Sequence, residues 1–301
     1  MVQRIADNTI NANFRTQINR HQLALSVLQE RLSSGKRINR PSDDPYGLEA
    51  VINLRTSRTE IEQFSRSATA ANQKLVVVDE SLNGYENVLD RVRALVTQGL
   101  SDTNTQSAQD ALATEIEALR SRILSVANSQ VGGEYVFGGT RQDAPPFDPV
   151  TAAPSLTASN AQYIQIEPGS DAIAAGVTAE TVFADSTSNI FDDLTQAVTA
   201  LRGTGDPAAD RSTLENTFSR LKVYSDLAAV SHAFVGVNME ITEIVQDRLN
   251  SHELFFDSQI SSIEDADFAE TVFELSETQA ALEATYRAAA SSRPSLLDFI
   301  G

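Results

Sequence analysis

Residues 14–32, FRTQINRHQLALSVLQERL, carry the apolar repeat that decides how this chain folds. The repeat alternates spacings of four and three residues. Its six positions are Phe14, Ile18, His21, Leu25, Leu28 and Leu32. Such spacing places its members along one side of a helix and predicts that this side packs against a partner helix, as in a coiled coil.

The C-terminal part of the chain carries a matching repeat in residues 268–286, FAETVFELSETQAALEATY. Its positions are Phe268, Val272, Leu275, Gln279, Leu282 and Tyr286. When the two series are read in opposite directions, the residue numbers of each pair sum to 300, and the polar members His21 and Gln279 fall in one layer. A lone buried polar pair can fix the register of paired helices. We therefore predict an antiparallel pair of terminal helices, with these twelve positions as an assembly interface.

The distribution of charge favours the same pairing. Residues 1–60 hold nine Lys and Arg against six Asp and Glu, although the whole chain has a formal net charge of −18. The register brings together Arg31 with Glu270, Lys36 with Glu264, and Arg37 with Asp265. Exposed ion pairs contribute only ~0–1 kcal/mol each, so their expected role is to select partner and orientation. For any single pair, the alternative to an ion pair is that the two charged side chains are solvated independently. The negative charge argues against general nucleic-acid binding.

A second long helix is predicted to begin after the loop that follows Gly35, a residue suited to ending the first helix. Asp44 fits the N-cap position and Pro45 the first helical position. Apolar residues keep the four–three spacing through residues 61–96, and the spacing stays in phase across Asn83-Gly84. This pattern predicts one continuous helix, with a third helix over residues 112–126.

The composition changes at Gly132-Gly133. Residues 134–137, EYVF, are typical of one arm of a β-hairpin. Residues 144–189 are rich in Pro, Thr, Ser and Ala, and contain strand-like pieces at 163–166 and 181–183. This segment is predicted to be a small β-containing insertion.

Helical spacing resumes at Phe191, stops at residues 203–207, and continues from Ala208 towards Ser291. The predicted fold is therefore mainly α, with long antiparallel helices in a rod-like bundle, paired terminal helices and a small β insertion. The predicted domains are the paired terminal helices (1–45 and 256–301), a helical rod (46–140 and 190–255) and the insertion (141–189).

Residues that could form a catalytic or metal site do not converge in the sequence. The chain has no Cys, and its histidines, at positions 21, 232 and 252, lack partners at ligand spacing apart from the adjoining Glu253. Gly203-Thr204-Gly205-Asp206 lacks the Lys of a phosphate-binding loop, and the acidic residues of 264–277 lack a calcium-loop pattern. We therefore expect no catalysis, no cofactor and no metal. An enzyme carried on residues 141–189 is the weakest alternative, because that segment has no His.

The N-terminal residues lack the apolar core and cleavage site of a Sec signal peptide, and no stretch is apolar enough to predict a membrane span. If the protein leaves the cell, we expect a route that needs no cleaved leader.

Two segments resemble a known family. Residues 32–45, LSSGKRINRPSDDP, resemble the N-terminal signature of bacterial flagellins and their relatives, and residues 263–270, IEDADFAE, resemble the C-terminal one. In that superfamily the terminal helices pair in the inner tube of the flagellum, next to a rod-like helical domain with variable domains outside. Residues 134–140, EYVFGGT, and 282–290, LEATYRAAA, are similar to the hook–filament junction proteins within the superfamily. Arg293-Pro294 departs from their pattern and would end the last helix early.

The resemblance implies a secreted, non-enzymatic subunit of the motility apparatus that joins the hook, through the first hook-associated protein, to the flagellin filament. It also implies self-assembly into a ring and export through the flagellar type III apparatus with a chaperone, without nucleic acid or membrane as partner. The alternative is a short flagellin that serves as a filament subunit. A cytoplasmic helical signalling module would fit the heptads but would not account for the two signatures.

Overall fold

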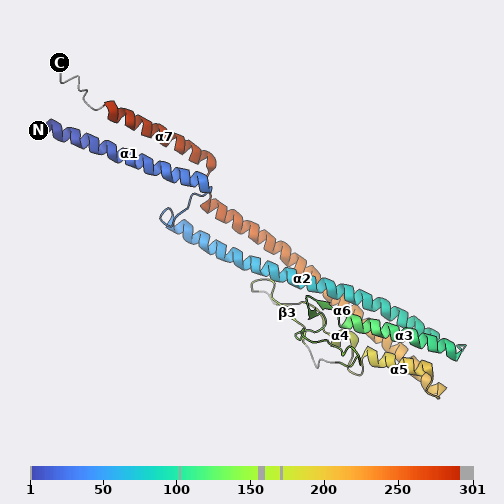
Figure 1. Ribbon diagram of the computed structural model, residues 1–301. Coiled ribbons are helices and arrows are strands. Elements are labelled where there is room, and N and C mark those ends of the chain that lie inside the picture. Colours follow the sequence, from blue (N-terminus) through green and yellow to red (C-terminus); the bar gives the residue numbers. More distant parts are fainter. Residues whose placement is uncertain (1, 102, 155–159, 170–171, 292–301) are drawn as a thin grey trace. The chain divides into compact units, whose positions relative to one another are not determined.

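The computed structural model describes residues 2–101, 103–154, 160–169 and 172–291 (Figure 1). The elements in chain order are α1 (Val2–Ser34), α2 (Pro45–Gly99), α3 (Gln106–Ala127), β1 (Gln130–Val131), β2 (Glu134–Tyr135), β3 (Tyr163–Ile164), β4 (Ile173–Ala174), α4 (Ala179–Phe183), α5 (Ile190–Arg202), α6 (Pro207–Glu264) and α7 (Phe268–Ser291). Strand β1 pairs with β2, and β3 with β4, each in antiparallel register. The predicted mainly α fold with a small β component is confirmed.

The chain divides into two compact units. The described residues of 1–60 and 252–301 form one, called here the terminal unit, and those of 61–251 form the other, called the central unit. The predicted three-part division stays a prediction, but the described residues of 141–189 lie in the central unit. Phe147 and Phe183 belong to the same apolar core as α2, α3 and α5.

Helix α2 begins and continues as the sequence predicts. The Asp44 carboxylate accepts a hydrogen bond from the Gly47 amide at 2.9 Å, which satisfies one of the free N–H groups of the first turn. The helix then runs without interruption through Asn83-Gly84. Its apolar repeat is buried in the central unit, where Tyr85 meets Phe183 edge to face with 4.7 Å between ring centroids.

Helix α6 lies beside α2 in the central unit (Figure 1), and its buried face follows the same four–three spacing. The buried residues between positions 210 and 249 are Asp210, Leu214, Thr217, Leu221, Tyr224, Ala228, Ser231, Val235, Asn238, Thr242, Val245 and Leu249. The hydroxyl of Thr242 donates to the Asn238 carbonyl at 2.7 Å, and the Asn238 amide group donates to the Phe234 carbonyl at 3.0 Å. Asn238 and Thr242 can therefore occupy this face because carbonyl groups of their own helix satisfy them.

The predicted β pieces are shorter than expected, and one is wrong. Strands β2 and β3 cover only the first two residues of the predicted segments 134–137 and 163–166. Residues 181–183 form the end of the short helix α4 instead of a strand. Thr178 caps α4 by accepting a hydrogen bond from the Thr181 amide, and this local bond outweighs the β preference of Thr and Val.

Replacing Gly35 with Ala is expected to destabilise the protein by about 1–2 kcal/mol. Gly35 ends α1 with φ = +72°, in the left-handed region that a side chain disfavours, while its amide donates to the Arg31 carbonyl at 2.8 Å. The matched control is Gly84→Ala within α2, where a Cβ meets open space and removing a flexible Gly should stabilise by about 0.5–1 kcal/mol. Denaturant unfolding should show a lower free energy of unfolding for Gly35→Ala and a higher one for Gly84→Ala. Changes of the same sign would contradict the role of Gly35 in ending α1.

Candidate assembly surface

The terminal helices α1 and α7 lie side by side and antiparallel in the terminal unit (Figure 1). Backbone hydrogen bonds close one end of the pair: the Ala266 amide donates to the Gly35 carbonyl at 3.0 Å, and the Arg37 amide to the Glu264 carbonyl at 2.7 Å. In both bonds the two residue numbers sum to 301, whereas the predicted register gives sums of 300, so the observed register lies within one residue of the prediction. The predicted antiparallel pairing of the chain ends is therefore confirmed.

The contact face of α1 uses the predicted residues. Among residues 12–29, the residues that are buried or half-buried are Phe14, Ile18, His21, Leu25 and Leu28. Leu28 is the most deeply buried of them, with 6% of its surface exposed, and Leu32 continues the face as a half-buried residue.

The contact face of α7 differs from the prediction. Its less exposed residues are Thr271, Leu275, Thr278, Ala281, Leu282, Thr285 and Ala289. Only Leu275 and Leu282 belong to the predicted set, and Phe268, Val272, Gln279 and Tyr286 are exposed. The Thr271 hydroxyl donates to the Asp267 carbonyl at 2.6 Å and that of Thr285 to the Ala281 carbonyl at 2.8 Å. Thr can therefore face α1 without an unsatisfied polar group, and a search for large apolar side chains misses it.

The predicted polar layer of His21 and Gln279 is also wrong, because Gln279 is exposed. A different polar contact joins the two helices: the Gln22 side-chain amide donates to the Tyr286 hydroxyl at 3.1 Å.

Large apolar side chains remain exposed on the outer sides of the helical pair. We call this set the apolar flank; it comprises Leu23 and Val27 on α1 and Phe268, Val272, Phe273 and Tyr286 on α7. Phe273 keeps 71% of its surface exposed. Two paired helices seal one side of each helix and leave the other sides to solvent. Six large apolar side chains exposed on one pair of helices indicate a surface for contact with another molecule.

The junction between the terminal helices is held by one carboxylate. The Glu264 side chain is 9% exposed and accepts from Lys36 Nζ at 2.9 Å and from Arg55 Nη2 at 2.5 Å. The predicted pair of Lys36 with Glu264 is confirmed. Arg37 instead lies 3.4 Å from the Asp44 carboxylate and donates to the Ile263 carbonyl, so its predicted pairing with Asp265 is wrong.

The third predicted pair is absent as well: among the described side chains, no ion pair joins Arg31 to Glu270. In the loop after Gly35, Lys36 and Arg37 contact the last turn of α6 rather than α7, and Arg37 also lies beside Asp44.

Replacing Glu264 with Gln is expected to destabilise the junction by about 1–2 kcal/mol, because the change weakens two charge-assisted hydrogen bonds whose cations are partly exposed. Hydrogen exchange of the Arg37 amide, which is bonded to the Glu264 carbonyl, should then be faster by about tenfold. Glu270→Gln, an exposed neighbour on α7, should leave that rate unchanged. Unchanged protection in the Glu264 variant would show that the carboxylate does not hold the junction.

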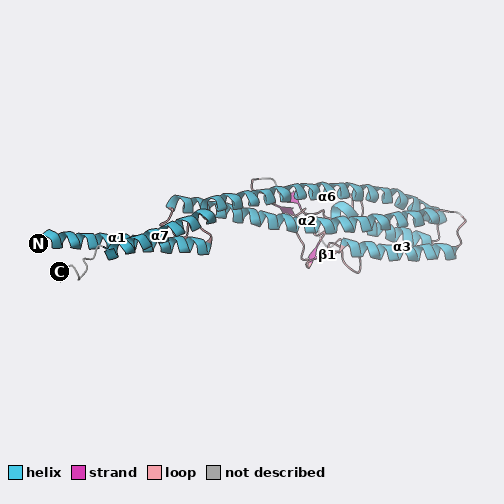
Figure 2. Cartoon of the chain, turned by 90° about the horizontal axis from the view of Figure 1, so that it is seen from above, coloured by secondary structure: helices cyan, strands magenta, loops and turns pink. Residues whose placement is uncertain are grey.

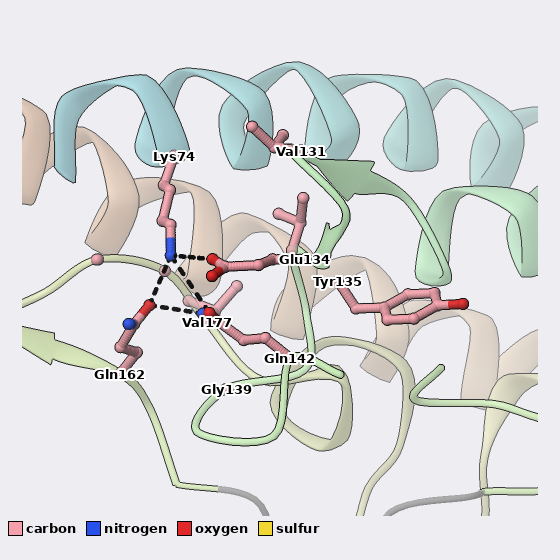
Figure 3. A pocket seen from close by; sticks show the side chains of 11 residues that line it. Lys74, Val131, Glu134, Tyr135, Gly139, Gln142, Gln162 and Val177 are labelled. Atoms are coloured by element: carbon pink, nitrogen blue, oxygen red, sulfur yellow. Dashed lines mark hydrogen bonds and ion pairs between the residues drawn. The ribbon is translucent and has the colours of Figure 1, made fainter. Parts of the chain in front are cut away.

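A polar cluster in the central unit surrounds Lys74 (Figure 3). Its ammonium lies 2.6 Å from the Glu134 carboxylate, 3.3 Å from Gln142 Oε1 and 3.0 Å from Gln162 Oε1. These bonds tie α2 to the β1–β2 hairpin and to the insertion. The adjoining cavity of about 20 Å³ is large enough for a water molecule but not for a substrate.

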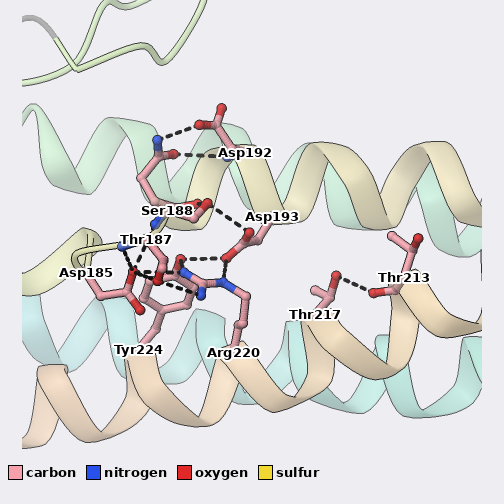
Figure 4. Close-up of polar contacts among 10 residues, drawn as sticks. Asp185, Thr187, Ser188, Asp192, Asp193, Thr213, Thr217, Arg220 and Tyr224 are labelled. Carbon is pink, nitrogen blue, oxygen red and sulfur yellow. Dashed lines mark hydrogen bonds and ion pairs between the residues drawn. The ribbon is translucent and has the colours of Figure 1, made fainter.

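A second cluster surrounds Arg220 of α6 (Figure 4). Its guanidinium pairs with the Asp193 carboxylate of α5, lies 3.1 Å from that of Asp185, and donates to the Tyr224 hydroxyl at 2.8 Å. The Tyr224 hydroxyl donates in turn to Asp193 at 2.6 Å. Hydrogen bonds from Thr187 and from the Ser188 amide hold the pKa of Asp185 well below its usual range, and burial raises the pKa of Tyr224. The cluster is saturated with internal partners and fixes α5 on α6.

Sequence spacing missed the partners of His232. Its ring nitrogens lie 2.8 Å from Asp79 and 3.4 Å from Glu86, both on α2 and far away in sequence. In the part of the chain that the structure describes, no group of three metal-ligating side chains is placed to hold an ion. Within the same residues, no helix combines the length and apolarity needed to span a bilayer.

Comparison with known proteins defines the class first. Residues 5–142 match the family model for the bacterial flagellin N-terminal helical region. Together with the paired terminal helices, this match confirms the resemblance to the bacterial flagellin superfamily. The relatives are structural proteins and place the chain in the bacterial flagellum; it is not an enzyme.

Within this class, the chain is similar to flagellar hook-associated protein 3. It is 27% identical to that protein of Escherichia coli K12, over 86% of this chain and 87% of the relative, and 24% identical to that of Salmonella typhimurium LT2 over the same shares. The flagellin of Salmonella rubislaw is 34% identical, over 47% of this chain but only 28% of the relative.

Solved structures show the same fold. A structure titled as a putative flagellar hook-associated protein of Vibrio parahaemolyticus has a TM-score of 0.68 at 17% identity, over 74% of this chain and 100% of that one. FlgL of Xanthomonas campestris has a TM-score of 0.63 at 16% identity, over 69% of this chain and 99% of that one.

Proposed function

We propose that this chain is a structural adaptor that joins the flagellar hook, through the first hook-associated protein, to the flagellin filament. One observation carries the proposal: the shared sequence spans 87% of hook-associated protein 3 of E. coli but 28% of the S. rubislaw flagellin. A match that extends along most of the hook-associated protein but along less than a third of the flagellin favours the adaptor. A short flagellin that serves as a filament subunit is the second candidate, favoured by the higher identity of 34% over the 142 residues that align.

The terminal unit supplies the contacts in this proposal. The α1 face and its α7 counterpart hold each chain's own helices together, while the apolar flank packs laterally against neighbouring copies in a ring. Burial of apolar surface contributes about 25 cal/mol per Å², so the exposed members of the predicted interface, among them Phe268, Val272 and Tyr286, supply the driving force. The same exposed surface calls for an export chaperone before secretion through the type III apparatus.

Position on the cell separates the two candidates. A labelled copy of the chain should appear as a single spot at the tip of each hook, and deletion of the gene should release unpolymerised flagellin into the medium. Label distributed along the filament, together with bare hooks after deletion, would replace the adaptor with a filament subunit.

A further inference from the structure

Several opposite charges on α1 and α7 have no partner within the chain. Helix α7 contains four Glu and one Arg, whereas residues 1–60 hold nine Lys and Arg against six Asp and Glu. Among the described side chains, no ion pair is formed by the following residues of the two helices: Arg20, Arg31, Glu270, Glu274 and Glu277. The helical pair therefore forms without using these complementary charges.

These charges lie along one edge of each helix. We call Arg20, Val27 and Arg31 the basic edge of α1, and Glu270, Glu274 and Glu277 the acidic edge of α7. Each member directly precedes a contact-face residue of its own helix, as Arg20 precedes His21 and Glu277 precedes Thr278. One residue corresponds to about 100° around a helix, so both edges point beside the partner helix rather than at it. Because the two helices are antiparallel, both edges lie on the same side of the pair.

An apolar side chain borders each edge on the side that is turned away from the pair. Leu23 lies two positions after His21 on α1, and Phe273 lies two positions after Thr271 on α7. Two positions correspond to about 200°, so both side chains face outwards, with 69% and 71% of their surface exposed. Each helix thus presents an apolar side chain beside charges, and the sign of the charges is opposite on the two helices.

We propose that the acidic edge of α7 in one copy packs against the basic edge of α1 in the next copy, with Phe273 of the first copy against Leu23 and Val27 of the second. The contact rests on the proposed function in one respect, namely that the copies stand side by side and point in the same direction. Figure 2 shows α1 and α7 next to each other in one chain. Copies of common direction repeat this arrangement, so α7 is antiparallel to the α1 of the next copy as it is to its own.

The charges favour a second copy of this chain over a different protein as the occupant. A partner surface of one sign satisfies one edge and leaves the other edge facing solvent. A row of identical copies satisfies both edges of every copy inside the row through a single repeated contact, which is a heterologous interface. The net charge of −18 does not oppose this contact locally, because the basic edge lies in the part of the chain with a positive balance. Exposed ion pairs add little stability, so they select partner and direction while apolar burial supplies the energy.

The test exchanges charges between copies. One variant has an acidic α1 (Arg20→Glu with Arg31→Glu), and the other has a basic α7 (Glu270→Lys, Glu274→Lys and Glu277→Lys). Either variant alone places like charges face to face at every contact, and should lower the number of labelled copies per flagellum at least severalfold. Expressed together in one cell, the two variants should recover most of the incorporation, because alternation places opposite charges at every contact.

Recovery by the mixture separates a contact between copies from an effect inside one chain. Within each variant the two edges keep like charges in the mixture, so an internal defect would persist. The matched control is Arg15→Glu with Asn19→Glu, two exposed positions that directly follow contact residues and lie on the other side of α1. This control should be incorporated normally. Normal incorporation of either edge variant alone, or no recovery by the mixture, would overturn the proposal.

A disulfide in isolated flagella gives an independent reading, since the chain has no Cys. A chain with Val27→Cys and Phe273→Cys should form disulfides between copies. A chain with Val27→Cys and Val272→Cys should not, because Val272 directly follows Thr271 and lies on the other side of α7. A bond to a different flagellar protein, or none, would overturn the proposed contact. If the label still marks the hook tips in that case, the adaptor function stands; label along the filament would replace the adaptor function without affecting the contact.

Discussion

Replacing Arg220 with Met is expected to destabilise the central unit by about 3–5 kcal/mol, because it leaves a buried carboxylate without its cation. The Asp193 side chain is 7% exposed and pairs with the Arg220 guanidinium while accepting a hydrogen bond from the Tyr224 hydroxyl (Figure 4). Met fills a similar volume, so the loss of stability is expected to come from removing the positive charge rather than from creating a cavity. Denaturant unfolding followed by circular dichroism measures the change.

Two comparison variants separate this mechanism from a general effect of removing an Arg. Arg91→Met removes an exposed pair with Glu115 and should cost less than about 1 kcal/mol. The double change Arg220→Met with Asp193→Leu removes both charges and should be more stable than Arg220→Met alone. If Arg220→Met and Arg91→Met lowered the free energy of unfolding equally, the Arg220 cluster would contribute no more to stability than an exposed ion pair.

Replacing Leu28 with Asp is expected to separate the terminal helices and to block incorporation into the flagellum. Leu28 is the buried centre of the α1 face, and its removal from water contributes about 1.5–3 kcal/mol. Burying a carboxylate in its place adds a further penalty, and a pair of helices has few other buried contacts to offset it. Hydrogen exchange should show lost protection in residues 12–32 and 268–291, with residues 61–99 unchanged.

The matched control is Gln29→Asp, which introduces the same charge at an exposed neighbouring position of α1. This variant should keep the protection of the terminal helices and should still assemble. Normal assembly of the Leu28→Asp variant would show that the pairing of α1 with α7 is not needed for incorporation into the flagellum.

Large apolar side chains made much of this fold predictable. The repeat of residues 14–32 identified the contact face of α1, and the repeat of residues 61–96 identified one unbroken helix through Asn83-Gly84. In both cases burial of apolar area is the dominant energy, and the sequence records it directly.

Faces built from small polar residues were harder to predict. The contact face of α7 uses Thr271, Thr278 and Thr285, and the buried face of α6 uses Thr217, Asn238 and Thr242. Several of these side chains donate to the carbonyl four residues earlier, which allows burial without a distant partner. Hydropathy alone treats such residues as exposed. Thr at the same four–three spacing was the signal that could have revealed the α7 face.

Contacts between residues far apart in sequence were beyond local patterns. The His232 ring meets Asp79 and Glu86 across two helices, and Arg220 meets Asp185 and Asp193 only because α5 packs on α6. At the candidate assembly surface, the contacts of Arg37 depended on the course of the loop after Gly35. Only the pair of Lys36 with Glu264, adjacent to the backbone bonds that close the helices, could be placed from the register.

Each chain's own first and last helices are expected to stay paired in the assembled organelle. The direct measurement is a disulfide between Leu25→Cys and Leu275→Cys, both on the contact faces of a chain that has no other Cys, in flagella isolated from cells that carry the double variant. A disulfide within one chain is expected, and none is expected when Leu25→Cys is combined with Glu274→Cys at an exposed position of α7. A disulfide that never forms between 25 and 275, or that forms only between chains, would contradict it.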